Sequence, residues 1–413
     1  MTLAVTGAVL DGETVGLRCV DGTIAALGPE VAPEPGDETI EAGGAPLLPP
    51  LVNGHTHAAM TLFRGSGGDL PLMPWLEEKI WPVEAKLSEE DVYWGTRLAC
   101  AEMARSGTTR FWDMYWHPTA SARAVLDAGM RAAIGAPLID MNGDGAGLRE
   151  TALRSLDALA ELGPAIEPAL APHAIYTVSE DSLRWIGELS REREVPVQIH
   201  LAETEQEVAG CLSTNGVRPA AYLDRLGVLS ERTVLAHGVW LDEEELELIA
   251  ARGCTLVANP AANMKLAVGG VFPYPAARAA GAAIGLGTDG AGSNDSLDLL
   301  ADLKLFALSQ KHAAGDPTAI AAEDAWAVAT GAQAPRLGAT ELAVGAPADF
   351  LLLRPDAPEL SFGELASDLV YAAAGSAVET TVVGGQVLVR DGQVPELAEV
   401  VARAKERASR LGL

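Results

Sequence analysis

Cysteine is scarce in this sequence. Its 413 residues include four cysteines, which are Cys19, Cys100, Cys211 and Cys254. They lie far apart and form no CxxC pair, so the pattern predicts neither a disulfide framework nor a zinc site made of thiolates.

Positive charge is scarce as well. Lys and Arg total 29 against 57 Asp and Glu, which gives a formal net charge of −28. Such a surface repels nucleic-acid phosphates and anionic lipid, so we expect neither as a partner. A small neutral or cationic ligand in a local pocket is compatible with this charge.

The sequence also has no long apolar run and no basic leader. No uncharged apolar run reaches ~18 residues without Gly or Pro, so no transmembrane helix is expected. The first residues soon reach Asp11 and Glu13, and we see no signal peptide. We expect a cytoplasmic protein, and the sequence leaves open whether it is a homo-oligomer.

Both ends of the chain have a sequence pattern typical of short β-strands joined by tight turns. These strands are expected at residues 3–10, 15–20, 23–27, 349–353 and 380–383, and an amphipathic helix is expected at 396–411. We therefore predict a small β-sandwich domain from residues 1–49 and 346–395, followed by a C-terminal helix within 396–413.

Residues 50–345 alternate short β-rich runs with longer helical stretches, which is typical of βα units around a parallel sheet. The predicted strands are Leu51–His57, Thr108–Asp113, Arg131–Asp140, Glu167–His173, Val195–Leu201, Thr233–His237, Cys254–Asn259 and Ala282–Asp289. These units predict an α/β fold, a (β/α)8 TIM-like barrel.

Histidines gather where the predicted strands end, which is where barrel enzymes build their sites. His55 and His57 share one face of a strand, although such a pair alone is also common in ordinary loops. His200, His237 and Asp289 end further strands. Three imidazoles and one carboxylate suit Zn²⁺ or Fe²⁺ with room for a water.

The ordered series His55-x-His57, His200, His237 and Asp289 resembles the amidohydrolase superfamily in its single-metal form. Further segments resemble its 5′-methylthioadenosine/S-adenosylhomocysteine deaminase group and the chlorohydrolase relatives. These segments are residues 51–57, 60–65, 172–173, 200–204, 259–266 and 287–290. The resemblance runs over nearly the whole chain.

The lysines bear on the metal count. In two-metal members a carbamylated lysine on the fourth strand bridges the ions, but none of the lysines here falls in residues 167–173, which end in His173. We therefore expect one divalent metal, with Zn²⁺ favoured and Fe²⁺ as the alternative.

The resemblance implies a role for each site residue. His55, His57, His200 and Asp289 would hold the metal, and His237 would be a weaker ligand or orient the attacking water. Asp289 would take a proton from that water, and Glu203 would protonate the ring nitrogen. The alternative for Glu203 is a solvated charge at the start of a helix.

Substrate-binding residues rest mainly on the resemblance. Trp75 would line the 5′ side of a nucleoside, and Glu84 would accept hydrogen bonds from the ribose hydroxyls. His173 would contact the ribose or the ring, beside Glu203. Plain core packing is the alternative for Trp75.

Ala136, in the segment of the third strand, stands where relatives that bind homocysteine adducts place an arginine. Arg149 is the nearest replacement. Since a charge-assisted clamp is missing at Ala136, the sequence favours a small or apolar 5′ group over S-adenosylhomocysteine.

The sequence therefore predicts a deaminase that converts the 6-amino group of an adenine nucleoside to the inosine form. The candidate substrates are 5′-methylthioadenosine, S-adenosylhomocysteine, 5′-deoxyadenosine and adenosine. One alternative is a related hydrolase acting on aminodeoxyfutalosine, guanine, cytosine or an s-triazine. Another is an inactive barrel that serves as a scaffold.

Overall fold

The structure is a computed structural model that describes residues 2–66, 69–141, 143–360 and 363–413. Its centre is a set of parallel strands in two four-stranded sheets, with the orders β10-β8-β7-β6 and β12-β13-β14-β15, and a two-stranded sheet of β9 and β11. The strands are β6 (Leu51–Thr56), β7 (Thr108–Met114), β8 (Arg131–Gly135), β9 (Pro137–Leu138), β10 (Ile166–Pro168), β11 (Ala171–Pro172), β12 (Val197–Leu201), β13 (Thr233–His237), β14 (Thr255–Ala258) and β15 (Ala283–Leu286).

Hydrogen bonds join the two sheets into a ring. On one side the Gln198 N–H donates to the Leu170 carbonyl at 2.9 Å. On the other side the Asp289 N–H donates to the His55 carbonyl at 3.0 Å, which links the last strand to the first. The predicted TIM-like barrel is confirmed.

The third and fourth predicted strands are each divided, into β8 and β9 and into β10 and β11. Prolines explain the breaks, because Pro137 starts β9 and Pro168 ends β10, and proline has no N–H for the ladder. The other predicted strands lie within two residues of those observed at either end, apart from the end of the last one, which stops at Leu286.

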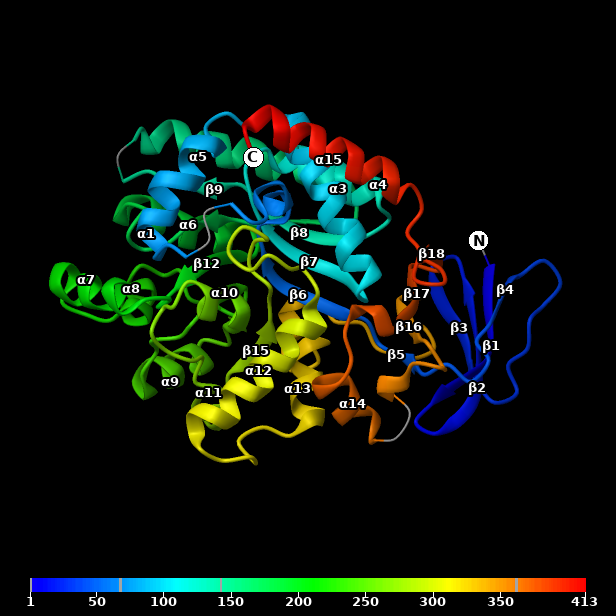
Figure 1. Cartoon of the computed structure of the whole chain (residues 1–413). Helices are drawn as coiled ribbons and strands as arrows, with labels where there is room; N and C mark the ends of the chain where they lie inside the picture. Colours follow the sequence, from blue (N-terminus) through cyan, green and yellow to red (C-terminus); the bar gives the residue numbers. More distant parts are fainter. Residues whose placement is uncertain (1, 67–68, 142, 361–362) are drawn as a thin grey trace.

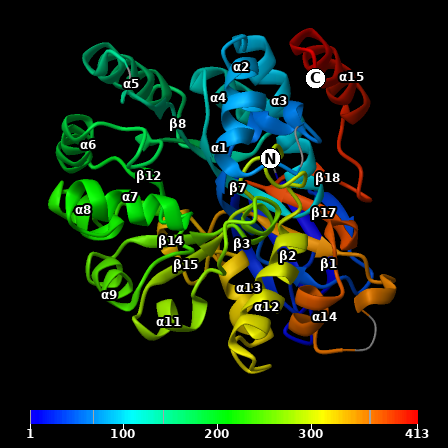
Figure 2. The same ribbon diagram turned by 60° about the vertical axis from the view of Figure 1, so that its left-hand side comes forward.

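Helices cover the outside of the ring (Figure 2). They are α3 (Glu89–Arg105), α4 (Pro118–Asp127), α5 (Gly145–Ala160), α6 (Glu180–Arg193), α7 (Glu205–Asn215), α8 (Pro219–Arg225), α9 (Glu243–Ala251), α10 (Pro260–Lys265), α11 (Tyr274–Ala279), α12 (Leu299–Ala314), α13 (Ala322–Ala329) and α14 (Leu365–Tyr371). Several begin at a side-chain cap that satisfies a free amide, such as Ser88 before α3 and Thr204 before α7. No helix in the described ranges is both long and apolar enough to cross a membrane.

The first strand is followed by a run of short helical turns that lie over the barrel mouth. They are η1 (Ala58–Phe63), α1 (Leu72–Trp75), η2 (Leu76–Ile80) and α2 (Trp81–Glu84). This segment carries Trp75, Trp81 and Glu84 toward the candidate site.

Segments from the first and last parts of the chain form two four-stranded sheets beside the barrel, while the C-terminus itself lies at the end of the terminal helix (Figure 1). One sheet contains β1 (Thr2–Leu10), β2 (Glu13–Val20), β3 (Thr23–Gly28) and β4 (Glu38–Glu41). The other contains β5 (Leu47–Leu48), β16 (Phe350–Leu353), β17 (Val378–Val383) and β18 (Gln386–Val389). One apolar core joins them, with Leu17 and Ile24 beside Phe350, as expected for a β-sandwich. The residue bounds of the two domains stay a prediction.

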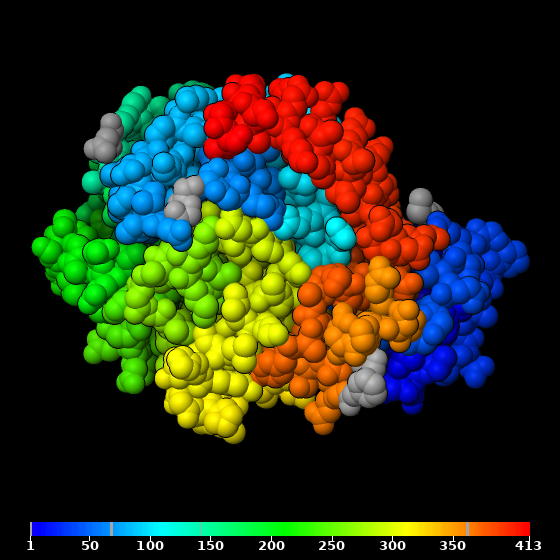
Figure 3. All heavy atoms as spheres, viewed as in Figure 1, coloured from blue at the N-terminus to red at the C-terminus, as the bar shows by residue number. Residues whose placement is uncertain are grey.

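The predicted terminal helix is α15 (Leu397–Leu411). It runs along the surface against the segment that contains α3 (Figure 3). Arg407 Nη1 lies 2.8 Å from Glu90 Oε2, and Arg410 pairs with the buried Asp91. These contacts fasten the end of the chain to the barrel.

The barrel floor is closed by an apolar plug. Leu337, at the end of the turn η3 (Pro335–Leu337), is fully buried in a cluster with Trp112, Val52 and Val257. A Cβ atom added at Gly285 would overlap Leu337 Cδ1, and one at Gly54 would lie 3.0 Å from it. Glycine on these two strands therefore leaves the space that the leucine fills.

Candidate active site

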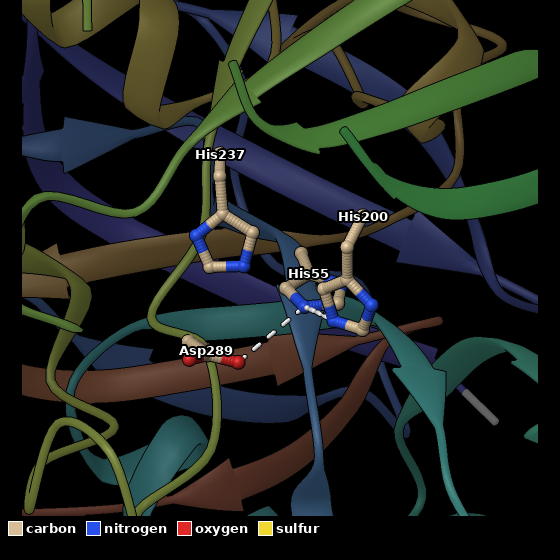
Figure 4. A group of neighbouring side chains, drawn as sticks. All are labelled: His55, His200, His237 and Asp289. Carbon is tan, nitrogen blue, oxygen red and sulfur yellow. Dashed lines mark hydrogen bonds and ion pairs between the residues drawn. The ribbon is translucent and has the colours of Figure 1, made fainter. Parts of the chain in front are cut away.

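Four buried side chains from four strand ends point toward one another at the barrel mouth (Figure 4). They are His55 at the end of β6, His200 in β12, His237 at the end of β13 and Asp289 after β15. Each offers one ligand atom, and these atoms lie within 4.8 Å of one another. The predicted convergence of distant strand ends is therefore present.

The spacing of these atoms is that of ligands around one ion. His200 Nε2 lies 3.1 Å from His55 Nε2 and 3.3 Å from His57 Nε2. His57 Nε2 lies 3.1 Å from Asp289 Oδ1. Tetrahedral ligands at zinc–nitrogen distances are about 3.3 Å apart. His57 and His237 therefore both lie at the same centre as His55, His200 and Asp289, so all five predicted residues surround one point.

Hydrogen bonds behind the imidazoles fix their orientation. The Nδ1 atom of His57 lies 2.7 Å from the Met114 carbonyl, and that of His200 lies 2.7 Å from the His173 carbonyl. Since a carbonyl only accepts, each Nδ1 carries a proton, and Nε2 is the nitrogen that faces the centre and could bind a metal. Metal-binding histidines are oriented in this way.

Asp289 presents one oxygen to the same point. The Ser293 hydroxyl donates to Asp289 Oδ2 at 2.6 Å. Asp289 Oδ1 is buried and lies 3.1 Å from His57 Nε2 and 3.4 Å from His55 Nε2, but it has no well-directed hydrogen bond among the described residues. An unsatisfied buried oxygen is costly, and a cation would satisfy it. The donor set, the spacing and this oxygen together fit one divalent metal.

Burial sets the charge of the cluster. It lowers the pKa of His55 to about 4 and holds that of His200 well below the usual range, so both imidazoles are neutral. Burial alone would raise the pKa of Asp289, but the imidazoles of His55 and His57 hold it well below its usual range. Burial opposes a charge on His57, but the neighbouring Asp289 carboxylate raises its pKa to about 9, and a bound divalent cation would displace that proton.

Glu203 lies two residues beyond β12 at the edge of this cluster. Its side chain is 5% exposed, and burial raises the pKa of its carboxyl. Glu203 Oε1 lies 3.9 Å from His237 Nδ1. Burial therefore favours the protonated form of this carboxyl more than water would for a surface glutamate.

A cavity opens above the cluster. Its lining includes Trp75, Trp81, Glu84, Trp116, His173, Tyr176, Glu203, His237 and Asp289. Glu84 Oε2 accepts a hydrogen bond from Trp116 Nε1 at 3.2 Å, and burial raises the Glu84 pKa. His173 Nδ1 lies 2.9 Å from Thr177 Oγ1. Trp75, Glu84, His173 and Glu203 therefore face one cavity, as the substrate roles require.

Arg149 is placed differently. It lies on α5 and is not among the described residues that line this cavity. No lysine or arginine side chain is among those lining residues. A substrate contact of Arg149 stays a prediction.

Three residues that support the cluster were not among the predicted site residues. Asn263 Oδ1 lies 2.8 Å from His237 Nδ1, and Asn259 Oδ1 accepts from the His237 N–H at 3.2 Å. Ser293 holds Asp289. Asn259 and Asn263 lie in the quoted segment 259–266, so their amides at a strand end were the available signal.

Comparison with known proteins places this site in a family. The model of the Amidohydrolase family matches residues 47–388. A 5′-deoxyadenosine deaminase of Methanoregula boonei is 48% identical over 90% of this chain and 86% of that protein. A 5-methylthioadenosine/S-adenosylhomocysteine deaminase of Syntrophobacter fumaroxidans is 44% identical over 94% of this chain and 93% of that protein.

Solved structures are similar over the whole chain. An adenosine deaminase from Xanthomonas campestris with bound zinc has a TM-score of 0.92 at 34% identity, covering 100% of this chain and 98% of that chain. An atrazine chlorohydrolase from Arthrobacter aurescens complexed with zinc has a TM-score of 0.88 at 22% identity, covering 98% of this chain and 100% of that chain. The second likeness shows the shared fold alone.

Proposed function

The chain belongs to the amidohydrolase family, and from that premise we propose that it is a metal-dependent deaminase of adenine nucleosides. Water replaces the 6-amino group, giving the inosine form and ammonia. The observation that carries this proposal is the buried carboxyl of Glu203 beside the histidine–aspartate cluster, within a cavity that also contains Glu84. The relatives named as adenosine-type deaminases support it.

One divalent metal belongs at this site. His55, His57, His200 and Asp289 would hold it, with Zn²⁺ favoured and Fe²⁺ as the alternative, and His237 would be the weaker ligand. When bound, such an ion acts as a Lewis acid that lowers the pKa of water toward about 7.

The protein's own groups then move the protons. Asp289 Oδ1 accepts a proton from the attacking water, which His237 orients toward C6 of the purine. Glu203 donates a proton to N1, so negative charge does not accumulate on the ring. Asp289 passes its proton to the amine, which leaves as ammonia, and the C6 hydroxyl gives up its own proton as the carbonyl forms, which restores the proton on Glu203.

The cavity also suggests how a nucleoside is held. Glu84 offers carboxylate oxygens to the 2′- and 3′-hydroxyls of a ribose. Trp75 lies on the 5′ side, and His173 contacts the ribose or ring. The lack of a lysine or arginine in the described lining supports 5′-deoxyadenosine, 5′-methylthioadenosine or adenosine over S-adenosylhomocysteine.

The acidic composition supports a free nucleoside as partner. With a net charge of −28 the surface disfavours nucleic acid and anionic membranes. We place the reaction in the cytoplasm, with the homo-oligomeric state left to measurement.

The decisive experiment is turnover of a panel of 5′-substituted adenosines by the zinc-loaded protein, followed by the absorbance change from adenine to hypoxanthine. We expect the highest kcat/KM for a small 5′ group. Turnover of a free base or an s-triazine with none of any adenosine derivative would overturn the proposal. No turnover and less than about a tenth of an equivalent of metal would favour the scaffold alternative.

A further inference from the structure

A second buried glutamate stands behind Glu203. Glu207, in the first turn of α7, is 6% exposed. Its Oε1 accepts the Ala202 N–H at 2.9 Å, and its Oε2 accepts the Glu203 N–H at 2.9 Å. One side chain thus holds two consecutive backbone amides of the turn that connects β12 to α7.

That turn has an unusual backbone. Ala202 has a φ of +48°, in the left-handed region that residues with a Cβ atom rarely adopt. Such a conformation persists only when the surroundings hold it, and it is often found at functional sites. The two hydrogen bonds from Glu207 act on the amides on either side of the strained residue.

The turn also touches the neighbouring strand end. The Trp240 N–H donates to the Ala202 carbonyl at 2.9 Å, and the Gly238 N–H donates to the Leu201 carbonyl at 2.9 Å. Gly238 directly follows His237, and Trp240 lies shortly after it in the same loop. The turn that aims Glu203 is therefore also connected to the loop that carries His237.

Glu207 does not line the catalytic cavity; it faces a separate groove with Tyr176 and Trp240. It cannot act on the substrate directly. We propose that Glu207 is a positioning residue, which keeps Ala202 in its left-handed conformation and so aims the Glu203 carboxyl at the substrate ring. This inference rests on the proposed function of Glu203.

The chain offers a matched control. Glu245 in α9 is 3% exposed, and its Oε1 accepts the Ala220 N–H at 2.8 Å. Its Oε2 accepts from Arg218 Nε at 2.8 Å. It is buried like Glu207 and also accepts a backbone amide, with an arginine in place of the second amide, and it is not among the described residues lining the catalytic cavity.

The test compares Glu207→Gln with Glu245→Gln in the zinc-loaded protein. Both substitutions replace a buried acceptor oxygen by an NH₂ group, so both should lower the thermal unfolding midpoint. We expect kcat to fall about 10- to 100-fold for Glu207→Gln, with KM within threefold and zinc retained, because the reacting acid is misaligned. Glu245→Gln should keep kcat within about twofold.

A rescue distinguishes positioning from a general loss of stability. Glycine adopts positive φ freely, so Ala202→Gly should leave the parent kcat within about twofold and, combined with Glu207→Gln, should recover at least about fivefold in kcat. If Glu207→Gln does not fold, Glu207→Asp replaces it. The shorter Asp arm cannot reach both amides, so kcat should still fall at least about fivefold.

Three results would overturn the inference: an unchanged kcat in the Glu207 variant, an equal kcat loss in the Glu245 control, or no recovery in the double variant. A parent protein that deaminates no adenosine derivative would instead refute the proposed function. The two failures are thereby separated.

Discussion

The plug in the barrel floor gives a quantitative prediction. Leu337→Ala removes a fully buried side chain that packs on Trp112 and Val257. A buried Leu→Ala change leaves a cavity, and we expect the free energy of unfolding to fall by about 3–5 kcal/mol. Leu308 on α12, which is 44% exposed, is the control. Leu308→Ala should change the free energy of unfolding by less than about 0.5 kcal/mol.

The same contact predicts that a substitution at Gly285 partly compensates for the loss of the Leu337 side chain. Gly285→Ala adds a Cβ atom that overlaps Leu337 Cδ1, and overpacking of this kind should cost about 1–3 kcal/mol. In the Leu337→Ala background that overlap is gone and the new methyl group fills part of the cavity. The double variant should therefore be more stable than the sum of the single effects by about 1–2 kcal/mol.

Urea denaturation followed by tryptophan fluorescence measures the parent and the four variants, at one fixed zinc concentration because bound metal adds to the apparent stability. Additive effects, with a coupling below about 0.5 kcal/mol, would refute the reasoning. They would mean that the leucine does not occupy the space between the glycine-bearing strands.

Four further predictions concern the site and its surroundings. Asp289→Asn should lower kcat on the order of 10³-fold or more in steady-state assays, because the proton acceptor is lost; activity near the parent level would remove Asp289 from the mechanism. Dialysis against a chelator should abolish turnover and added Zn²⁺ should restore it, with about one equivalent by elemental analysis; full activity without metal would contradict this. Glu84→Gln should lower kcat/KM about 10- to 100-fold for ribosides and much less for 2′,3′-dideoxy analogues, and an equal loss for both would argue against ribose binding. Burial raises the pKa of Asp302 to about 8 from 3.8, so the folded state binds the extra proton and the free energy of unfolding should fall as pH rises from about 4 to 8; Asp302→Asn should flatten this slope in urea titrations, and an unchanged slope would contradict the assignment.

Much of the barrel could be predicted from the sequence, because each strand is a short apolar run whose period differs from that of the following helix. The strand Thr233–His237 is observed with the predicted bounds. The breaks at Pro137 and Pro168 were less predictable, since an isolated proline at a sheet edge does not show whether a strand ends or only bends there.

The site could be predicted as a set of residues but not as a geometry. Strand ends indicate that His55, His200, His237 and Asp289 meet, because parallel strands share one mouth. Which imidazoles lie closest to the centre depends on χ angles and on outward hydrogen bonds, such as the one from His57 to Met114, that no spacing encodes. Glu207 was missed because its partners are backbone amides, and an alanine at positive φ has no sequence signature.

The hydrogen bond between Asp289 and His55 joins the two ends of the barrel sequence, which are separated by more than half the chain. A nascent chain whose last barrel strand is still inside the ribosome therefore has the site histidines in place but lacks Asp289. Its ring of strands is still open. Ion capture and completion of the fold then become a single late event. Zinc binding by chains truncated at increasing lengths would accordingly show at which point of synthesis the metal site is complete.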